Sequence, residues 1–299
     1  MVPSPNALTV PPATVVSASP LPRDPVLVQY RNPVPFFLLA TAIPWAFWFA
    51  AAWVSRQPDP SRLWISVLGL AGLIAPVAVA GWFIGRDPVL RRDVAARLVG
   101  RGTFTPWIAL SAVFLLPASL LLATALSIPL GYDAAQFQFR DGFSFTAGVV
   151  PVWIVLVAAS ILEELAWHTY GTDALASRMR VLTATLVFTV IWALWHLPLG
   201  FIEGYYQNEV AEEGALHVAN FVFSMVALLV LMNWLYYRSG RSVLVVIVFH
   251  LSANFGNELF QTHPDTKLIQ TALLLVLAAV VVWHDRRLFL TTPEQRATP

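Results

Sequence analysis

The feature that most constrains this chain is a series of eight apolar segments, each about as long as a helix that crosses a bilayer. A helix rises about 1.5 Å per residue, so roughly 20 apolar residues span the hydrocarbon layer. Hydrophobic residues make up 58% of the 299 residues and charged residues only 12%, which is far more apolar than a soluble domain. We therefore predict an all-α polytopic membrane protein with about eight transmembrane helices. The predicted spans are residues 36–54, 63–85, 106–130, 147–170, 182–202, 215–237, 242–260 and 268–284.

The regions outside the spans differ in composition from the membrane domain. Residues 1–35 hold nine of the 22 prolines and no compact apolar core, which predicts a disordered tail. Residues 36–284 form one predicted membrane domain, and residues 285–299 a cytoplasmic C-terminal tail. The absence of cysteine excludes disulfides and thiol chemistry. A net charge of +1 without a basic, aromatic surface excludes nucleic acid as a partner.

The charges in the connections predict the orientation. Alternate connections place 14 Lys and Arg residues on one side of the membrane. The other side has only Arg56, Arg62, Arg140 and Lys267. Because basic residues collect on the cytoplasmic side, we expect a multi-pass protein of the cell membrane with both termini in the cytoplasm.

Nearly all of the strongly polar side chains inside the predicted spans of the second half are five residues: Glu163, Glu164, His196, His250 and Asn254. A carboxylate at the centre of a membrane helix costs roughly 2.5–3.5 kcal/mol on insertion scales, so two adjacent ones need an offset. A single histidine or asparagine at such a depth is more often a packing residue. Together, however, the five favour one polar cavity inside the bundle.

A hairpin would bring the first of these groups together. If the chain turns at residues 177–180, Glu163 and His196 each lie about 16 residues from the turn and reach similar depths. If residues 168–180 instead lie along the membrane surface, the two side chains are separated. We favour the hairpin. His168 follows Glu164 by four residues on the same helical face, where it could hydrogen-bond that carboxylate or act as an additional ligand.

Three short motifs carry these residues: EELAWH from Glu163 to His168, WALWH from Trp192 to His196, and HLSAN from His250 to Asn254. In this order, on separate spans, they resemble the motifs of the intramembrane protease family that includes CAAX prenyl proteases, bacteriocin-processing and abortive-infection proteins (CPBP family). The resemblance covers residues 145–260, which we take as the expected catalytic core.

The resemblance implies peptide-bond hydrolysis within the membrane, on a hydrophobic or lipidated peptide or protein. Glu163 would act as general base on a water held jointly with His196, and His250 and Asn254 would stabilise the oxyanion. Glu164 would support this geometry. Burial and hydrogen-bond donors make such chemistry reasonable. Whether a zinc ion joins the site is left open by the sequence.

Two details qualify the resemblance. Glu163, His196 and His250 could form a His₂Glu zinc set, but no HExxH motif is present. The arginine that ends the family's first motif is replaced by His168, which could neutralise Glu164 only when protonated. We therefore expect activity to be weaker, pH-dependent or absent if that arginine neutralises the second glutamate.

Two other functional classes are compatible with the same residues. The chain could be a non-catalytic immunity or chaperone-like factor on this scaffold. It could also be a proton-coupled carrier, because buried Glu and His also form proton relays. Paired broken helices in inverted repeats would indicate a carrier, and none is clear in the sequence. The side from which a substrate reaches the cavity stays open at this stage.

Overall fold

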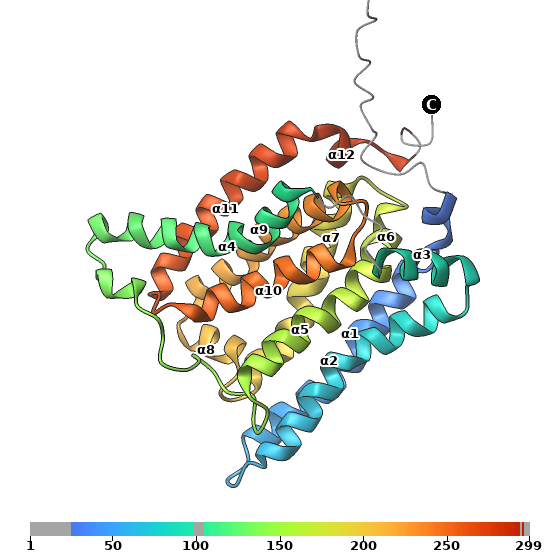
Figure 1. Ribbon diagram of the computed structural model, residues 1–299. Coiled ribbons are helices and arrows are strands. Elements are labelled where there is room, and N and C mark those ends of the chain that lie inside the picture. The colour runs from blue at the N-terminus through green and yellow to red at the C-terminus, as the bar shows by residue number, and fades with distance from the viewer. Residues whose placement is uncertain (1–24, 99–104, 294, 296–299) are drawn as a thin grey trace, which may run out of the picture.

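The computed structural model describes residues 25–98, 105–293 and 295, and within these ranges the chain is almost entirely helical (Figure 1). The one β-type pairing in the described part is an isolated bridge between Phe139 and Phe260. The elements are η1 (Pro25–Gln29), α1 (Pro33–Ser55), α2 (Arg62–Gly85), α3 (Pro88–Leu98), α4 (Pro106–Ser127), η2 (Ile128–Leu130), η3 (Ala134–Phe137), α5 (Val152–Ala166), η4 (Trp167–Gly171), α6 (Thr172–Ala176), α7 (Val181–His196), η5 (Leu197–Phe201), α8 (Tyr206–Glu212), α9 (Ala215–Arg238), α10 (Val243–Leu259), α11 (Pro264–His284) and α12 (Arg286–Leu290).

The prediction of an all-α membrane protein with about eight spans is confirmed. Seven helical stretches among the described residues are long and apolar enough to cross a membrane. They are Pro33–Ser55, Arg62–Gly85, Pro106–Leu130, Val152–Ala176, Val181–Phe201, Ala215–Arg238 and Pro264–His284. The remaining predicted span, 242–260, is α10, a shorter apolar helix. Its 17 residues give a length of about 25 Å.

The spanning helices alternate in direction, so the connections gather at two ends of the bundle. At the end that we call the arginine-rich end lie η1, α3, α12 and the turns at residues 177–180 and 239–242. At the opposite, arginine-poor end lie α8, the turn at residues 56–61 and the long connection 128–151. In Figure 1 the arginine-rich end is at the upper right, near α3, α6 and α12, and the arginine-poor end is at the lower left.

Both predicted tails include residues that the structure places in the folded bundle. Residues 1–24 of the predicted 1–35 tail lie outside the described residues, but residues 25–29 form η1. Tyr30 is fully buried, and its hydroxyl donates to Asp93 Oδ2 at 2.5 Å. At the other end, residues 286–290 form α12, which buries Leu288 and Phe289. These buried aromatic and apolar side chains pack both chain ends against the bundle. Residues 294 and 296–299 lie outside the described part.

The fourth span begins and ends later than predicted. Pro151 is the N-cap residue of α5, and the helical path continues to Ala176 through η4, a π-helical turn. The preceding loop is fixed to α2, because the Ser66 hydroxyl donates to Ala147 O at 2.9 Å and accepts from Val149 N at 2.8 Å. Gly148 has φ +70°, and an added Cβ would lie 2.3 Å from Ser66 Oγ. Glycine is thus required where this loop meets α2.

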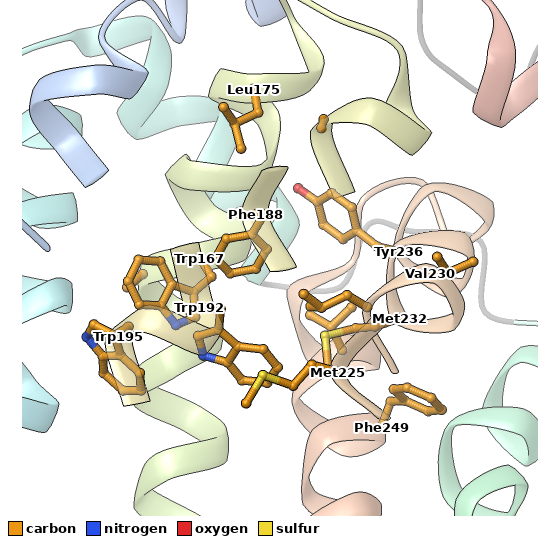
Figure 2. Close-up of a cluster of buried hydrophobic side chains, with 14 of the residues drawn as sticks. Trp167, Leu175, Phe188, Trp192, Trp195, Met225, Val230, Met232, Tyr236 and Phe249 are labelled. Carbon is orange, nitrogen blue, oxygen red and sulfur yellow. The ribbon is translucent and has the colours of Figure 1, made fainter. Parts of the chain in front are cut away.

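The predicted hairpin is present, and the alternative with residues 168–180 along the membrane surface is wrong. Residues 167–176 continue the helical path of α5, and α7 begins at Val181 directly after the turn. A buried aromatic cluster joins the two arms (Figure 2). The Trp167 ring centroid lies 5.4 Å from that of Phe188 and 5.6 Å from that of Trp195. This packing fixes the rotation of α7, so that Trp192 and His196 face the carboxylates of α5.

Candidate active site

A cavity of about 220 Å³ inside the bundle is lined by four of the five predicted site residues, Glu163, His196, His250 and Asn254. They come from three helices, α5, α7 and α10. Glu163 is 6% exposed, His196 9% and His250 4%. The structure thus places these four groups around one cavity, as the sequence predicted.

Trp192 connects the members of the site. Its indole Nε1 donates to Glu163 Oε2 at 2.8 Å, which orients that carboxylate. Its ring centroid also lies 5.0 Å from the His196 ring and 5.8 Å from the His250 ring. Trp192 belongs to the second motif, but no contact between it and Glu163 could be predicted from the sequence. Its position four residues before His196, on the same helical face, was the available signal.

The His196 ring is oriented by its own helix. Nδ1 lies 2.7 Å from Trp192 O, and because a carbonyl only accepts, this nitrogen carries the proton. In the neutral imidazole the other ring nitrogen, Nε2, is then an acceptor. Since His196 lines the cavity, its Nε2 is the nitrogen available to a water or ligand there.

Glu164 turns away from the cavity and lies between two imidazoles. His250 Nδ1 is 2.7 Å from Glu164 Oε1, and His168 Nδ1 contacts Oε2. The predicted contact between His168 and Glu164 is therefore confirmed. On the other side of its ring, His168 Nε2 lies 3.0 Å from Asn233 Oδ1, which fixes this nitrogen as a donor. Glu164 thus holds His250 in place and leaves Nε2 of His250 for the cavity.

Asn254 is also held by a second contact. Its Nδ2 donates to the Ser160 hydroxyl at 3.0 Å, and Ser160 in turn donates to Leu156 O at 2.8 Å. A second, longer contact joins the same nitrogen to Leu156 O at 3.5 Å, so two acceptors on α5 hold the carboxamide beside the cavity. Ser160 was missed at the sequence level, because a serine that bonds the carbonyl four residues earlier is common in membrane helices.

The sequence left open a His₂Glu zinc set of Glu163, His196 and His250. Among the described residues, no group of three or more His, Cys, Asp or Glu side chains is placed to hold a metal ion. Each of the three side chains has one hydrogen-bond partner: His250 Nδ1 is directed at Glu164, His196 Nδ1 at a carbonyl, and Glu163 accepts from Trp192. Nε2 of both histidines is still available in the cavity, so these bonds do not decide whether zinc binds.

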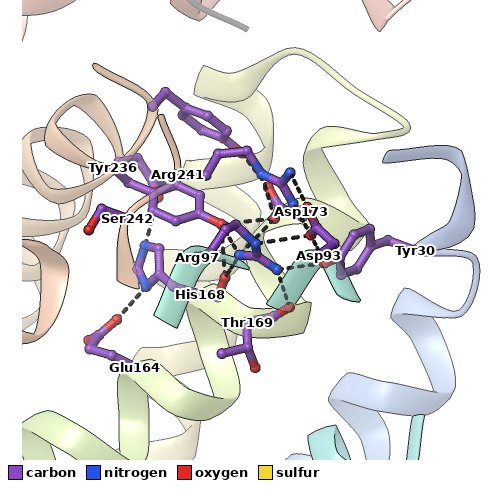
Figure 3. Close-up of polar contacts among 12 residues, drawn as sticks. Tyr30, Asp93, Arg97, Glu164, His168, Thr169, Asp173, Tyr236, Arg241 and Ser242 are labelled. Atoms are coloured by element: carbon purple, nitrogen blue, oxygen red, sulfur yellow. Dashed lines mark hydrogen bonds and ion pairs between the residues drawn. The ribbon is translucent and has the colours of Figure 1, made fainter. Parts of the chain in front are cut away.

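A second polar cluster, which the sequence did not predict, fills the arginine-rich end of the bundle (Figure 3). Arg241 Nη2 lies 2.8 Å from Asp93 Oδ2 and 2.6 Å from Asp173 Oδ2. Arg97 Nε lies 2.9 Å from Asp93 Oδ2, and the Tyr236 hydroxyl donates to Asp173 at 2.8 Å. We call Asp93, Arg97, Asp173, Tyr236 and Arg241 the ionic cluster.

The ionic cluster contacts the helix that carries the glutamates. Arg97 donates to His168 O at 2.8 Å and to Thr169 O at 3.0 Å, in the π-helical turn where intrahelical bonds are rearranged. Burial opposes ionisation of Asp93, but Arg97 and Arg241 outweigh it and lower the Asp93 pKa below its usual 3.8. A buried arginine thus supports the backbone at residue 168, although no arginine stands at that position in the sequence.

Comparison with known proteins gives two matches. Residues 145–256 match the family model described as Type II CAAX prenyl endopeptidase Rce1-like. The chain is also 32% identical over 260 residues to CAAX prenyl protease 2 of Methanococcus maripaludis, an alignment that covers 86% of this chain and 96% of that protein. The matched region contains all three motifs, and with them Glu163, His196, His250 and Asn254.

Proposed function

The chain belongs to the CAAX prenyl protease family, and we propose that its cavity hydrolyses a peptide bond in a hydrophobic or lipidated polypeptide held in the membrane. The observation that carries this proposal is the convergence of Glu163, His196, His250 and Asn254 on one buried cavity. Each of the four is oriented by a hydrogen bond to a neighbouring group. Such preorganised polar groups in a water-poor site are what acyl transfer requires.

In the proposed reaction, Glu163 and the acceptor nitrogen of His196 hold a water molecule. The Glu163 carboxylate takes a proton from this water as the oxygen attacks the carbonyl carbon of the substrate. The carbon–nitrogen bond then breaks, and the proton on Glu163 passes to the leaving amine. Trp192 keeps one oxygen of Glu163 in a fixed orientation. No side chain forms a covalent intermediate.

The negative charge that develops on the carbonyl oxygen needs donors on the other side of the cavity. His250 offers Nε2, because its Nδ1 is bound to Glu164. In the proposed reaction this nitrogen carries a proton and donates to the oxyanion. Asn254 offers the N–H that makes only the long contact of 3.5 Å with Leu156 O, which the substrate oxygen would replace. Removing one such donor typically slows acyl transfer by roughly 100- to 1,000-fold, so both side chains are expected to matter.

The test uses the purified full chain in detergent with synthetic peptides that carry a C-terminal prenylcysteine motif, matched to the same peptides without the lipid. Mass spectrometry identifies any new carboxyl terminus. We expect cleavage by the wild type, preference for the lipidated peptides, and no cleavage by Glu163→Gln or His196→Ala. Glu212→Gln, an exposed glutamate on α8, is the matched control. Equal cleavage by all four proteins, or none by the wild type, would refute the proposal.

A further inference from the structure

The cavity is not placed symmetrically between the two ends of the bundle. His196 is the last residue of α7, at the arginine-poor end. Asn254 lies five residues before the end of α10, about 8 Å along the helix. Glu163, by contrast, is 13 residues from Ala176 at the arginine-rich end, or about 20 Å. His196 and Asn254 are therefore nearer to the arginine-poor end. Glu163 lies close to the middle of its span, and His250 lies slightly nearer to the arginine-rich end of α10.

The rest of the cavity wall extends in the same direction. Its lining includes residues of two connections at the arginine-poor end, Phe145 to Ala147 and Tyr205 to Gln207, as well as Glu258 near the end of α10. Among the described residues that line it, none comes from η1, α3, α12 or the turns at the arginine-rich end. The space thus leads from the four site residues toward the arginine-poor end.

Buried side chains fill the region through which a channel from the cavity to the arginine-rich end would have to pass. Behind Glu163 lie Trp167 and Phe188, each 1% exposed. Beyond them the ionic cluster closes the space between α3, α6, α9 and the turn before α10, with Asp173 fully buried (Figure 3). Opening this end would separate buried guanidinium and carboxylate groups, which is costly.

In the structure, the basic side chains gather at one end of the bundle. The described arginines of the arginine-rich end are Arg31, Arg86, Arg91, Arg92, Arg97, Arg178, Arg180, Arg238, Arg241, Arg286 and Arg287. At the arginine-poor end, α8 and its flanks carry Glu203, Glu209, Glu212 and Glu213. Basic residues near span ends are retained on the cytoplasmic side, so the arginine-poor end is assigned to the non-cytoplasmic side.

We propose that the cavity is open to the non-cytoplasmic side of the membrane and closed toward the cytoplasm. Building on the function proposed above, its substrate is a membrane-anchored polypeptide whose cleaved segment lies at the outer surface. A polypeptide that reaches the membrane only from the cytoplasm would meet the ionic cluster instead.

The chain is well suited to a direct test, because it has no cysteine. Single-cysteine variants can therefore be labelled with a small charged thiol reagent that does not cross membranes. Ala159→Cys probes the cavity wall one turn before Glu163, and Thr146→Cys probes the exposed cavity mouth. Arg92→Cys probes the exposed surface of α3 at the arginine-rich end. Each is labelled in intact cells and in inverted vesicles, with detergent-solubilised protein as the control for reactivity.

We expect Ala159→Cys and Thr146→Cys to react in intact cells and to lose this labelling in inverted vesicles, with Arg92→Cys showing the reverse. Labelling of Thr146→Cys or Ala159→Cys from the cytoplasmic side, alone or in addition, would overturn the proposal. So would an Ala159→Cys that reacts only after solubilisation. Labelling does not depend on catalysis, so failure of the protease assignment would leave this result readable, and the reverse also holds.

Discussion

Replacing Asp173 by Asn tests the ionic cluster at its most buried member. Asp173 is fully buried and accepts from the Tyr236 hydroxyl at 2.8 Å and from Arg241 Nε and Nη2 at 3.1 and 2.6 Å. Its Oδ2 also lies 3.4 Å from Arg97 Nη1. Asparagine has nearly the same size but no charge, so two buried guanidinium groups would share the single carboxylate of Asp93.

The loss of this buried charge sets the expected change in the free energy of unfolding. Removing one partner of a buried ion pair costs about 3–5 kcal/mol, because the other charge stays buried without compensation. The asparagine oxygen still accepts one hydrogen bond, so we expect a loss of about 3 kcal/mol in the free energy of unfolding, the lower end of that range.

Equilibrium unfolding in mixed micelles, followed by tryptophan fluorescence, measures this quantity. Asp141→Asn is the matched control, since Asp141 is exposed in the connection 128–151 and should change stability by less than about 0.5 kcal/mol. If Asp173→Asn is no less stable than Asp141→Asn, the ionic cluster does not stabilise the bundle and our reasoning about the closed end is refuted.

Four further predictions follow from the same contacts. Trp192→Phe keeps the ring but removes the bond to Glu163; kcat/KM should fall about 10- to 100-fold, the effect of one hydrogen bond to a charged group, and an unchanged value would contradict this role. His168→Ala should lower kcat with little change in KM, because His168 positions Glu164 without touching substrate, and His168→Gln should restore part of the loss; a change in KM alone would count against it. Elemental analysis of the active protein should show less than one zinc per chain, and chelators should leave cleavage unchanged; stoichiometric zinc needed for activity would mean that Glu163, His196 and His250 hold the metal. The pKa of Asp93 in the folded protein is lowered from 3.8, so the ionised carboxylate stabilises the fold above pH 3.8, and this stabilisation is lost as the pH falls through the lowered pKa. On acidification below about pH 4, the midpoint of denaturation should therefore fall less steeply in Asp93→Asn than in the wild type.

The spans and the cavity residues were predictable because both depend on the cost of placing groups in a bilayer. Hydropathy is a property of each segment by itself, so the number of spans followed from the sequence. Ionisable groups are rare in such segments, so Glu163, His196 and His250 stood out and were expected to share one space. Their convergence also required the turn at residues 177–180, which the polar sequence there indicated.

The partners of these residues could not be predicted in the same way. Asn233 is a single polar residue in an apolar helix, and nothing local shows that it bonds His168 across 65 positions of sequence. The ionic cluster likewise joins residues far apart in the chain, such as Asp93 and Arg241, that lie near span ends, where charges are ordinary. Contacts of this kind arise from tertiary packing, and the sequence pattern carries no record of them.

We propose that Glu163 activates water in a membrane-embedded protease site. The most direct test is kcat/KM for one cleaved lipidated peptide, measured with wild type, Glu163→Gln and the exposed control Glu212→Gln, each shown to unfold at the same temperature. A general base contributes about 100- to 10,000-fold, so Glu163→Gln should lose at least about 100-fold while Glu212→Gln equals the wild type. A Glu163→Gln protein that cleaves as fast as the wild type would show that Glu163 is not the general base.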